Sequence, residues 1–278
     1  MLATFVIFFR ETLEASLVVG IILAYLHRIG RKDRASSVWI GVTAALALDL
    51  AVALVSYHLV HQYDGSRMQA ILEGCTYLVA TAMLTYMSFW MKEQSNQIRG
   101  NLERKVDVAL SRGSLGAMVL LSAVTVGREG LETAFFTLAI ALNQHGTPLL
   151  LGAFLGLLAG LGLNAWVSSL GRKAPLGLFF NVLGVLLLLF GAGLLADAVE
   201  SLQSIGWLPV LTGVVWHSQS LLSEGSALGD ILHSLFGYAQ SPTVLQALAY
   251  LVFLIATATA YLRLGGGHRA PGAVQDRP

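Results

Sequence analysis

The feature that most constrains this chain is a succession of long apolar segments. Windows of about 20 mostly apolar residues, the length that an α-helix needs to cross a bilayer, recur along most of the 278 residues. Only 12% of the residues are charged, whereas soluble domains usually carry about 25%. Backbone polar groups inside a bilayer must pair within helices or closed barrels, and these segments are too long for barrel strands. The sequence therefore predicts an all-α integral membrane protein.

Seven of these segments are expected to span the membrane and to form one domain over residues 1–264. A further segment, 201–242, is too polar to span and too apolar for a plain linker, so we expect re-entrant or interfacial helices on the outer side. Residues 265–278 are predicted to be a disordered tail on the inner side. The expected spans are 2–27, 36–60, 68–91, 114–142, 148–169, 177–200 and 243–263.

Basic residues are divided unequally between the two sides of this domain. Cytoplasmic loops of membrane proteins carry an excess of Lys and Arg. Only Arg67 lies on one side, so that side is expected to face outward, with the N-terminus outside and the C-terminus inside. The opposite side holds Arg28, Arg31, Lys32, Arg34, Lys92, Arg99, Arg104, Lys105, Arg112, Arg172, Lys173, Arg263, Arg269 and Arg277.

Two segments carry helical patterns of another kind. In the loop 92–113, apolar residues recur among charges at Ile98, Leu102, Val106 and Ala109. This pattern fits either an amphipathic helix on the inner membrane surface or a solvated linker helix. In the fifth span, the stripe formed by residues 152, 156 and 160 is all glycine, which predicts a surface for close helix packing.

One charged pattern interrupts the apolar segments twice. Arg10-Glu11-x-x-Glu14 lies in the first span, and Arg128-Glu129-x-x-Glu132 lies 118 residues later in the fourth. Equivalent helices three spans apart cross the membrane in opposite directions. The pattern therefore predicts a 3+3 inverted repeat, with residues 1–91 as repeat one, 114–200 as repeat two and the seventh span left over. Transporters use this architecture and bind substrate between the repeats.

The two motifs suggest a binding site for a cation. A charged residue at mid-membrane costs roughly 2.5–3.5 kcal/mol on insertion scales, so such groups face the protein interior or mark a functional path. Two glutamates three residues apart share one helix face, so two facing helices can direct four carboxylates at one volume. Carboxylate oxygens suit hard metal cations. The proposed metal ligands are Glu11, Glu14, Glu129 and Glu132.

The arginines of the motifs, Arg10 and Arg128, are interpreted as charge-tuning residues. Each arginine can pair with a glutamate of the other repeat. Together the four glutamates and two arginines carry a formal charge of −2. Two alternatives to a cation site stay open. The charges could form ion pairs that only lock helices together, or the arginines could bind an anion, which the excess of glutamate disfavours.

Other acidic residues extend the expected path. Asp49 lies in the middle of the second span, where it can contribute to the path or pair with an arginine in a structural role. Glu73, just inside the outer end of the third span, is a candidate ligand for an approaching cation. An acidic outer mouth should concentrate cations. It comprises Asp64, Asp197, Glu200, Glu224 and Asp230.

Several motifs of known chemistry do not occur in the sequence. It contains no His-Glu-x-x-His, no phosphate-binding Gly-x-x-x-x-Gly-Lys-Ser/Thr loop and no Gly-x-Ser-x-Gly elbow. An ATP-driven pump within this chain alone is therefore excluded. We expect no enzymatic activity and no catalytic residue.

At the two motifs the chain resembles the oxidase-dependent iron permease family, which comprises fungal high-affinity iron permeases and bacterial Efe-type relatives. That family carries Arg-Glu-x-x-Glu in its first and fourth spans, has seven spans and places its N-terminus outside. The resemblance covers nearly the whole chain. It includes Leu72-Glu73-Gly74 and the segment 216–238, which are similar to the bacterial branch.

The resemblance implies a permease of the plasma membrane, the inner membrane in bacteria, that imports iron. Iron would be the transported substrate, and no resident cofactor is expected. The implied species is Fe³⁺, produced by extracytoplasmic partners that oxidise or deliver iron. Two alternatives stay open: a permease for another divalent metal such as Fe²⁺, Mn²⁺ or Pb²⁺, and a non-transporting membrane subunit of an oxidase complex.

Overall fold

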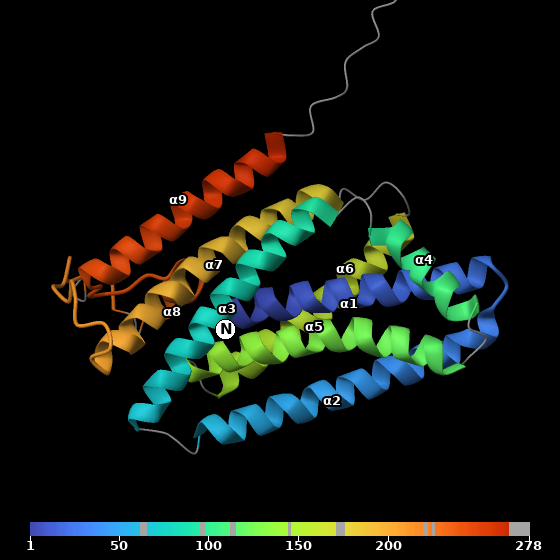
Figure 1. Cartoon of the computed structure of the whole chain (residues 1–278), viewed down its shortest axis with the longest axis horizontal. Helices are drawn as coiled ribbons and strands as arrows, with labels where there is room; N and C mark the ends of the chain where they lie inside the picture. Colours follow the sequence, from blue (N-terminus) through green and yellow to red (C-terminus); the bar gives the residue numbers. More distant parts are fainter. Residues whose placement is uncertain are drawn as a thin grey trace, which may run out of the picture.

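The structure is a computed structural model that describes residues 1–61, 66–94, 98–111, 115–143, 146–170, 176–218, 222–223 and 226–266. This part of the chain is almost entirely helical (Figure 1). Outside the helices it contains one isolated antiparallel bridge, between Val214 and Thr243. The helices are α1 (Leu2–Arg28), η1 (Lys32–Arg34), α2 (Ala35–His61), α3 (Arg67–Gln94), α4 (Ile98–Ser111), α5 (Leu115–Asn143), α6 (Thr147–Leu170), α7 (Leu176–Ser204), α8 (Ala227–Phe236) and α9 (Val244–Gly266).

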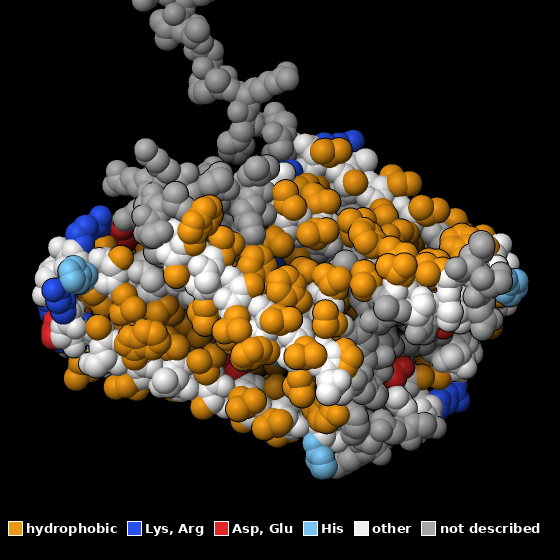
Figure 2. Space-filling view, turned by 180° about the vertical axis from the view of Figure 1, so that it is seen from behind, with side chains coloured by type: hydrophobic (Ala, Val, Ile, Leu, Met, Phe, Trp, Pro, Cys, Tyr) orange, Lys and Arg blue, Asp and Glu red, His pale blue; other side chains and the backbone are white. Residues whose placement is uncertain are grey.

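The fold is that of a helical membrane protein. Five helices in the described ranges, α2, α3, α6, α7 and α9, are long and apolar enough to cross a membrane. Helices α1 and α5 are as long, but each carries the three charged residues of a motif near its middle. Hydrophobic side chains cover most of the face in Figure 2, and the basic and histidine side chains gather toward its edges. Such an apolar exterior suits contact with lipid.

Three pairs of helices make the most extensive contacts: α2 with α5, α3 with α7, and α1 with α6. In Figure 1, α3, α7 and α9 run side by side, while α1, α2, α5 and α6 form a second group. Helices α3 and α7 are antiparallel, since Gly74 faces Leu202 and Gly191 faces Leu84. The α1–α6 and α2–α5 pairs are parallel, because the glycine contacts between the two helices of each pair advance in the same direction along both helices.

The glycine stripe of α6 packs directly on the backbone of α1. A Cβ at Gly152 would lie 2.3 Å from the carbonyl oxygen of Met1, and one at Gly156 would lie 2.5 Å from that of Phe5. At Gly160 it would lie 2.8 Å from the carbonyl oxygen of Phe9. The prediction of a close packing surface is therefore confirmed.

The α2–α5 pair shows the same kind of close approach. A Cβ at Gly41 in α2 would lie 2.1 Å from Oγ of Ser122 in α5. Further along the pair the roles are exchanged, and a Cβ at Gly130 in α5 would lie 1.7 Å from Oδ2 of Asp49 in α2. Both parallel pairs thus depend on small residues that bring two helix backbones together.

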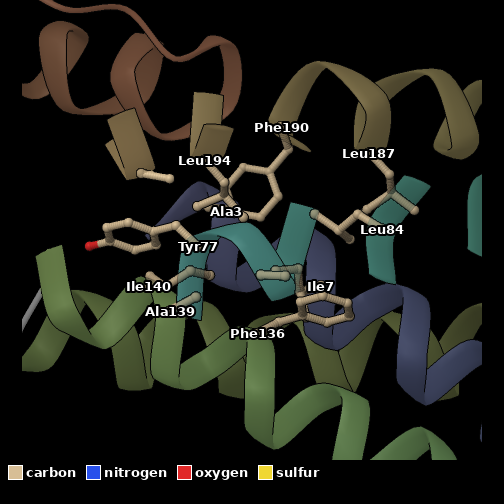
Figure 3. Packing of buried hydrophobic residues seen from close by; sticks show 12 residues of the cluster. Ala3, Ile7, Tyr77, Leu84, Phe136, Ala139, Ile140, Leu187, Phe190 and Leu194 are labelled. Carbon is tan, nitrogen blue, oxygen red and sulfur yellow. The ribbon is translucent and has the colours of Figure 1, made fainter. Parts of the chain in front are cut away.

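The two larger apolar clusters of the described residues lie on either side of the middle of the bundle. We call the end where α1 begins the Met1 end, and the end where η1 joins α1 to α2 the η1 end. Figure 3 shows the cluster toward the Met1 end, where Ile7, Tyr77 and Phe136 meet side chains of α7. The cluster at the η1 end contains Val19, Ile22, Leu26, Val38, Val42, Ala45, Leu102, Val106, Ala109, Met118 and Val126.

Helix α4 docks on the bundle rather than lying free of it. Its apolar residues Leu102, Val106 and Ala109 are buried in the cluster at the η1 end, against α1, α2 and α5. Tyr25 donates a hydrogen bond of 2.5 Å to Asp107, and Arg28 forms an ion pair with Glu103. The predicted helix is confirmed. Its apolar side is covered by protein and therefore faces neither lipid nor water.

The helices otherwise follow the expected ranges closely. The seven long helices begin and end within a few residues of the expected spans. The described residues between α7 and α9 include one short helix, α8, capped by Ser226 at its start and by Gly237, with a positive φ, at its end. Most of the expected disordered tail, residues 267–278, lies outside the described residues.

Candidate functional site

The two motifs meet in the interior of the bundle, where α1 packs against α5. Arg10 and Glu11 are almost completely buried, and Glu129 and Glu132 are exposed by less than a tenth of their surface. One carboxylate oxygen of each of Glu11, Glu14 and Glu129 lies within 4.8 Å of the other two. The structure thus brings together three of the four expected ligands from two helices.

Helix geometry explains this convergence. Each pair of glutamates is three residues apart and therefore projects from one face of its helix. Helices α1 and α5 run in opposite directions, because α5 is parallel to α2, which the η1 turn joins to α1. The motif glutamates of α1 and those of α5 can therefore approach one another in the space between the two helices.

Arg10 neutralises the first pair of glutamates. Its guanidinium group forms an ion pair with Glu11, and Nη2 lies 3.0 Å from Oε1 of Glu14. The same Nη2 lies 3.4 Å from the sulfur of Met87 and 3.3 Å from that of Met91, both on α3. The arginine side chain is fully buried, and its terminal nitrogens contact carboxylates and thioethers.

Arg128 occupies a different environment. Its Nε donates a hydrogen bond of 2.9 Å to Oε1 of Glu132, and its guanidinium lies over the Trp90 ring, 5.0 Å from the ring centre. Its side chain is 42% exposed, against 0% for Arg10. The two motifs therefore have the same sequence pattern but different surroundings. Arg10 is buried in the core, whereas Arg128 lines a cavity.

Several carboxylate oxygens of the site have no hydrogen-bond partner among the described residues, although they are buried. These atoms are Oε2 of Glu11, Oε2 of Glu129 and Oε2 of Glu132. A buried polar atom without a partner is costly, and an ionised one more so. A cation bound between the helices would supply the missing interactions, because carboxylate oxygens are ligands for hard metal ions.

A cavity of about 570 Å³ leads from the site toward the Met1 end of the bundle. We call it the vestibule. Glu11 and Glu129 line its inner part, and Gly146 and Leu149 line it at the Met1 end. Its walls come from α1, α2, α5 and α6, and its other side-chain oxygens come from Asp49 and from the hydroxyls of Thr12, Tyr57, Thr133 and Thr137.

A second cavity, of about 700 Å³, lies between α2 and α5 and touches α3 at Met83. We call it the side cavity. Most of its lining is apolar, and its charged residues are Asp49, Arg128 and Glu132. The fourth motif carboxylate therefore lines a different cavity from Glu11 and Glu129.

The outer acidic residues of the sequence analysis lie in other surroundings. Glu73 accepts a hydrogen bond of 2.8 Å from Gln69 and lines neither cavity. Glu200 accepts a hydrogen bond of 2.9 Å from Gln246, and Asp197 lies 4.0 Å from His233. Asp64 and Glu224 lie outside the described residues, and the side chain of Asp230 is not described.

Sequence reasoning missed the threonines of α5 and the two methionines that contact Arg10. A signal for the threonines existed, because Thr133 and Thr137 follow Glu129 at intervals of four residues and so continue its helix face. Nothing in the sequence pairs Met87 and Met91 with Arg10, since this contact depends on how α3 packs against α1.

Comparison with known proteins places these observations in a family. Residues 1–265 match the model of the Iron permease FTR1 family. The chain is 35% identical over 257 residues to the ferrous iron permease EfeU of Yersinia pestis, which covers 92% of this chain and 91% of that protein. It is 33% identical over 264 residues to the protein of the same name from Escherichia coli, covering 94% and 95%. No solved structure matches the chain.

Proposed function

Because the chain belongs to the iron permease FTR1 family, we propose that it imports iron through a single site built from both motifs. The observation that carries this proposal is the convergence of Glu11, Glu14 and Glu129, whose oxygens lie within 4.8 Å of one another in the middle of the bundle. Glu132 is the proposed fourth ligand. Releasing it from Arg128 lets it turn toward the other three carboxylates.

The proposed topology has seven spans, α1, α2, α3, α5, α6, α7 and α9, within one domain over residues 1–264. The parallel and antiparallel packing of the helix pairs supports it, because strict alternation makes α1 and α6 parallel, α2 and α5 parallel, and α3 and α7 antiparallel. The distribution of Lys and Arg then places the Met1 end outside and the η1 end inside.

The inverted repeat, 1–91 against 114–200, is supported by matching contacts in its two halves. Gly41 of α2 meets Ser122 of α5, and Gly152 of α6 meets Thr4 of α1. A shift of 118 residues relates Thr4 to Ser122, and a shift of 111 relates Gly41 to Gly152. The same two shifts relate the contact between Thr12 and Gly160 to the contact between Gly130 and Asp49.

The proposed route enters through the vestibule on the outer side. Glu73 and the outer acidic residues attract the cation, which sheds water onto the carboxylates at the inner end of the vestibule. The apolar cluster at the η1 end, together with α4, closes the way inward. Rocking of one repeat against the other would open that end. A membrane potential that is negative inside favours import by about 2.3 kcal/mol per charge per 100 mV.

The proposed charge balance gives the arginines a defined task. Four Glu and two Arg carry a formal charge of −2, which a divalent ion offsets and a trivalent ion exceeds by one. Without the arginines the four carboxylates would repel one another and take up protons. Arg10 and Arg128 therefore offset part of the carboxylate charge while the site is empty.

The proposed cargo is Fe³⁺ delivered by an oxidising or iron-delivering partner, as the resemblance implies. The matched relatives are named ferrous iron permeases, and that name favours Fe²⁺ as the second candidate. The test is uptake of radio-iron into liposomes that contain the purified chain. Iron is supplied as Fe²⁺ with reductant or as chelated Fe³⁺, with Mn²⁺ and Pb²⁺ as competitors and the Glu14→Gln, Glu132→Gln double variant as the blank.

Uptake of either form that is lost in the blank would support a self-sufficient iron permease and identify the species that it carries. If Mn²⁺ or Pb²⁺ suppresses the uptake of radio-iron at a lower concentration than unlabelled iron does, the transported ion is another divalent metal. Absence of uptake for both forms, with correctly folded protein, would contradict independent transport and favour the membrane subunit of an oxidase complex.

A further inference from the structure

Asp49, in the middle of α2, is the acidic residue that borders both the vestibule and the side cavity. It shares the vestibule with Glu11 and Glu129 and the side cavity with Glu132. Its exposed fraction is 6%. It therefore borders both of the cavities that motif carboxylates line.

The carboxylate of Asp49 has no hydrogen-bond partner among the described residues, and this holds for both Oδ atoms. Burying an unpaired carboxylate is costly, so a residue of this kind is retained for a reason other than packing. Asparagine or leucine would fill the same place at lower cost. The position thus lacks an interaction that a cation would provide.

The backbone of the second motif makes room for this side chain. A Cβ at Gly130 would lie 1.7 Å from Oδ2 and 2.3 Å from Cγ of Asp49, so any other residue at position 130 would displace the carboxylate. The matching place in the other half holds Gly160 on α6 and Thr12 on α1. Close packing there is achieved without an acid, so helix packing alone does not require one.

Neutral oxygens continue the path from Asp49 toward the Met1 end. The hydroxyl of Thr133 donates a hydrogen bond of 2.8 Å to the carbonyl of Glu129, and that of Thr137 donates one of 2.6 Å to the carbonyl of Thr133. With its hydrogen committed to the backbone, each hydroxyl oxygen can act only as an acceptor. Both residues line the vestibule, about one helical turn apart.

We propose that Asp49 is a fifth carboxylate ligand of the transported cation. It receives the ion in the vestibule, together with the oxygens of Thr133 and Thr137, and passes it to Glu11 and Glu129. This assignment rests on the proposed iron import and names a residue that neither motif contains. With this assignment, the vestibule has a cation ligand, Asp49, in addition to the motif glutamates Glu11 and Glu129 that line it.

The test is the binding of radio-iron to the purified full-length chain in detergent, by equilibrium dialysis, for Asp49→Asn and Asp49→Glu. Loss of a ligand should weaken binding on the order of tenfold in Asp49→Asn, and Asp49→Glu, which keeps the carboxylate, should recover part of it. The thermal stability of Asp49→Asn should equal or exceed that of the wild type, because no hydrogen bond is lost. A purely structural role predicts the opposite pair of results.

Two further variants sharpen the test. Gly130→Ala, whose methyl group would displace the Asp49 carboxylate, should weaken iron binding to a similar extent. The control Asp33→Asn removes the same charge from the exposed η1 turn and should leave the Kd within twofold of the wild type.

An unchanged Kd in Asp49→Asn, in a preparation where Glu129→Gln binds weakly, would overturn this assignment and leave the proposed function intact. Failure of the wild-type chain to bind iron in either oxidation state would overturn both.

Discussion

Nη2 of Arg10 lies 3.0 Å from Oε1 of Glu14 in the interior of the bundle, where the arginine side chain is fully buried. The same guanidinium also forms an ion pair with Glu11. The positive charge of Arg10 therefore forms ion pairs with two carboxylates of the proposed iron site. This arrangement and the unlike setting of Arg128 lead to the first prediction.

Arg10→Gln should destabilise the protein far more than Arg128→Gln. Removing one partner of a buried ion pair costs about 3–5 kcal/mol, because the other charge is left uncompensated. Arg128 is 42% exposed, and Glu132 is its one ion-pair partner within the described ranges, so its replacement should cost no more than about 1 kcal/mol. Thermal unfolding of both variants in the same detergent checks this. Equal losses would show that the two arginines are equivalent.

Gly156→Ala should weaken the packing of α1 on α6. The new methyl group would lie 2.5 Å from the carbonyl oxygen of Phe5 and 2.9 Å from the backbone nitrogen of Phe9, neither of which can move without separating the helices. Overpacking of this kind typically costs about 1–3 kcal/mol. The unfolding temperature is the measurement.

The matched control is Gly162→Ala, on the same helix. No atom lies within 4 Å of a Cβ at Gly162, and alanine is the better helix former by up to about 1 kcal/mol. This variant should be as stable as the wild type or slightly more so. Similar destabilisation by both changes would mean that the loss comes from α6 itself and not from its contact with α1.

Leu102→Ala should lower the stability of the chain while the motif site keeps its affinity for iron. Leu102 of α4 is buried in the cluster at the η1 end, and a buried Leu→Ala change costs about 2–5 kcal/mol. Chemical or thermal unfolding together with radio-iron binding checks both parts. If α4 lay on the membrane surface instead, the stability of the detergent-solubilised chain would hardly change.

The proposed topology predicts opposite accessibility for two exposed serines. Ser36, at the start of α2, is expected inside, and Ser204, at the end of α7, outside. In a background where Cys75 is replaced by serine, a membrane-impermeant thiol reagent added to intact cells should label Ser204→Cys and not Ser36→Cys. Labelling in the reverse pattern would invert the orientation, and labelling of both from outside would contradict the span count.

Much of the helical framework follows from hydropathy and charge, because a long apolar run has few alternatives to a helix inside a bilayer. The ranges of α1 to α3 and the meeting of the motifs were predictable for this reason. Hydropathy does not distinguish a side chain that faces lipid from one that faces another helix. The burial of Leu102 and Val106 against the bundle could therefore not be predicted.

The details of the site depend on packing between helices distant in sequence. The enclosure of Arg10 by Met87 and Met91 requires the position of α3, and the place of Asp49 is set by its contact with Gly130. The sequence could name Asp49 as a candidate. Only the fold adds that it borders both cavities and has no hydrogen-bond partner among the described residues.

The central claim is that carboxylates from both motifs bind one cation together. The most direct measurement is a double-mutant cycle in the Kd for iron, with Glu11→Gln, Glu129→Gln and the double variant. If both residues hold the same ion, each single change should weaken binding strongly and the double change should weaken it by much less than the product of the two. Effects that multiply would mean that the two glutamates act at separate places, and this would contradict the shared site.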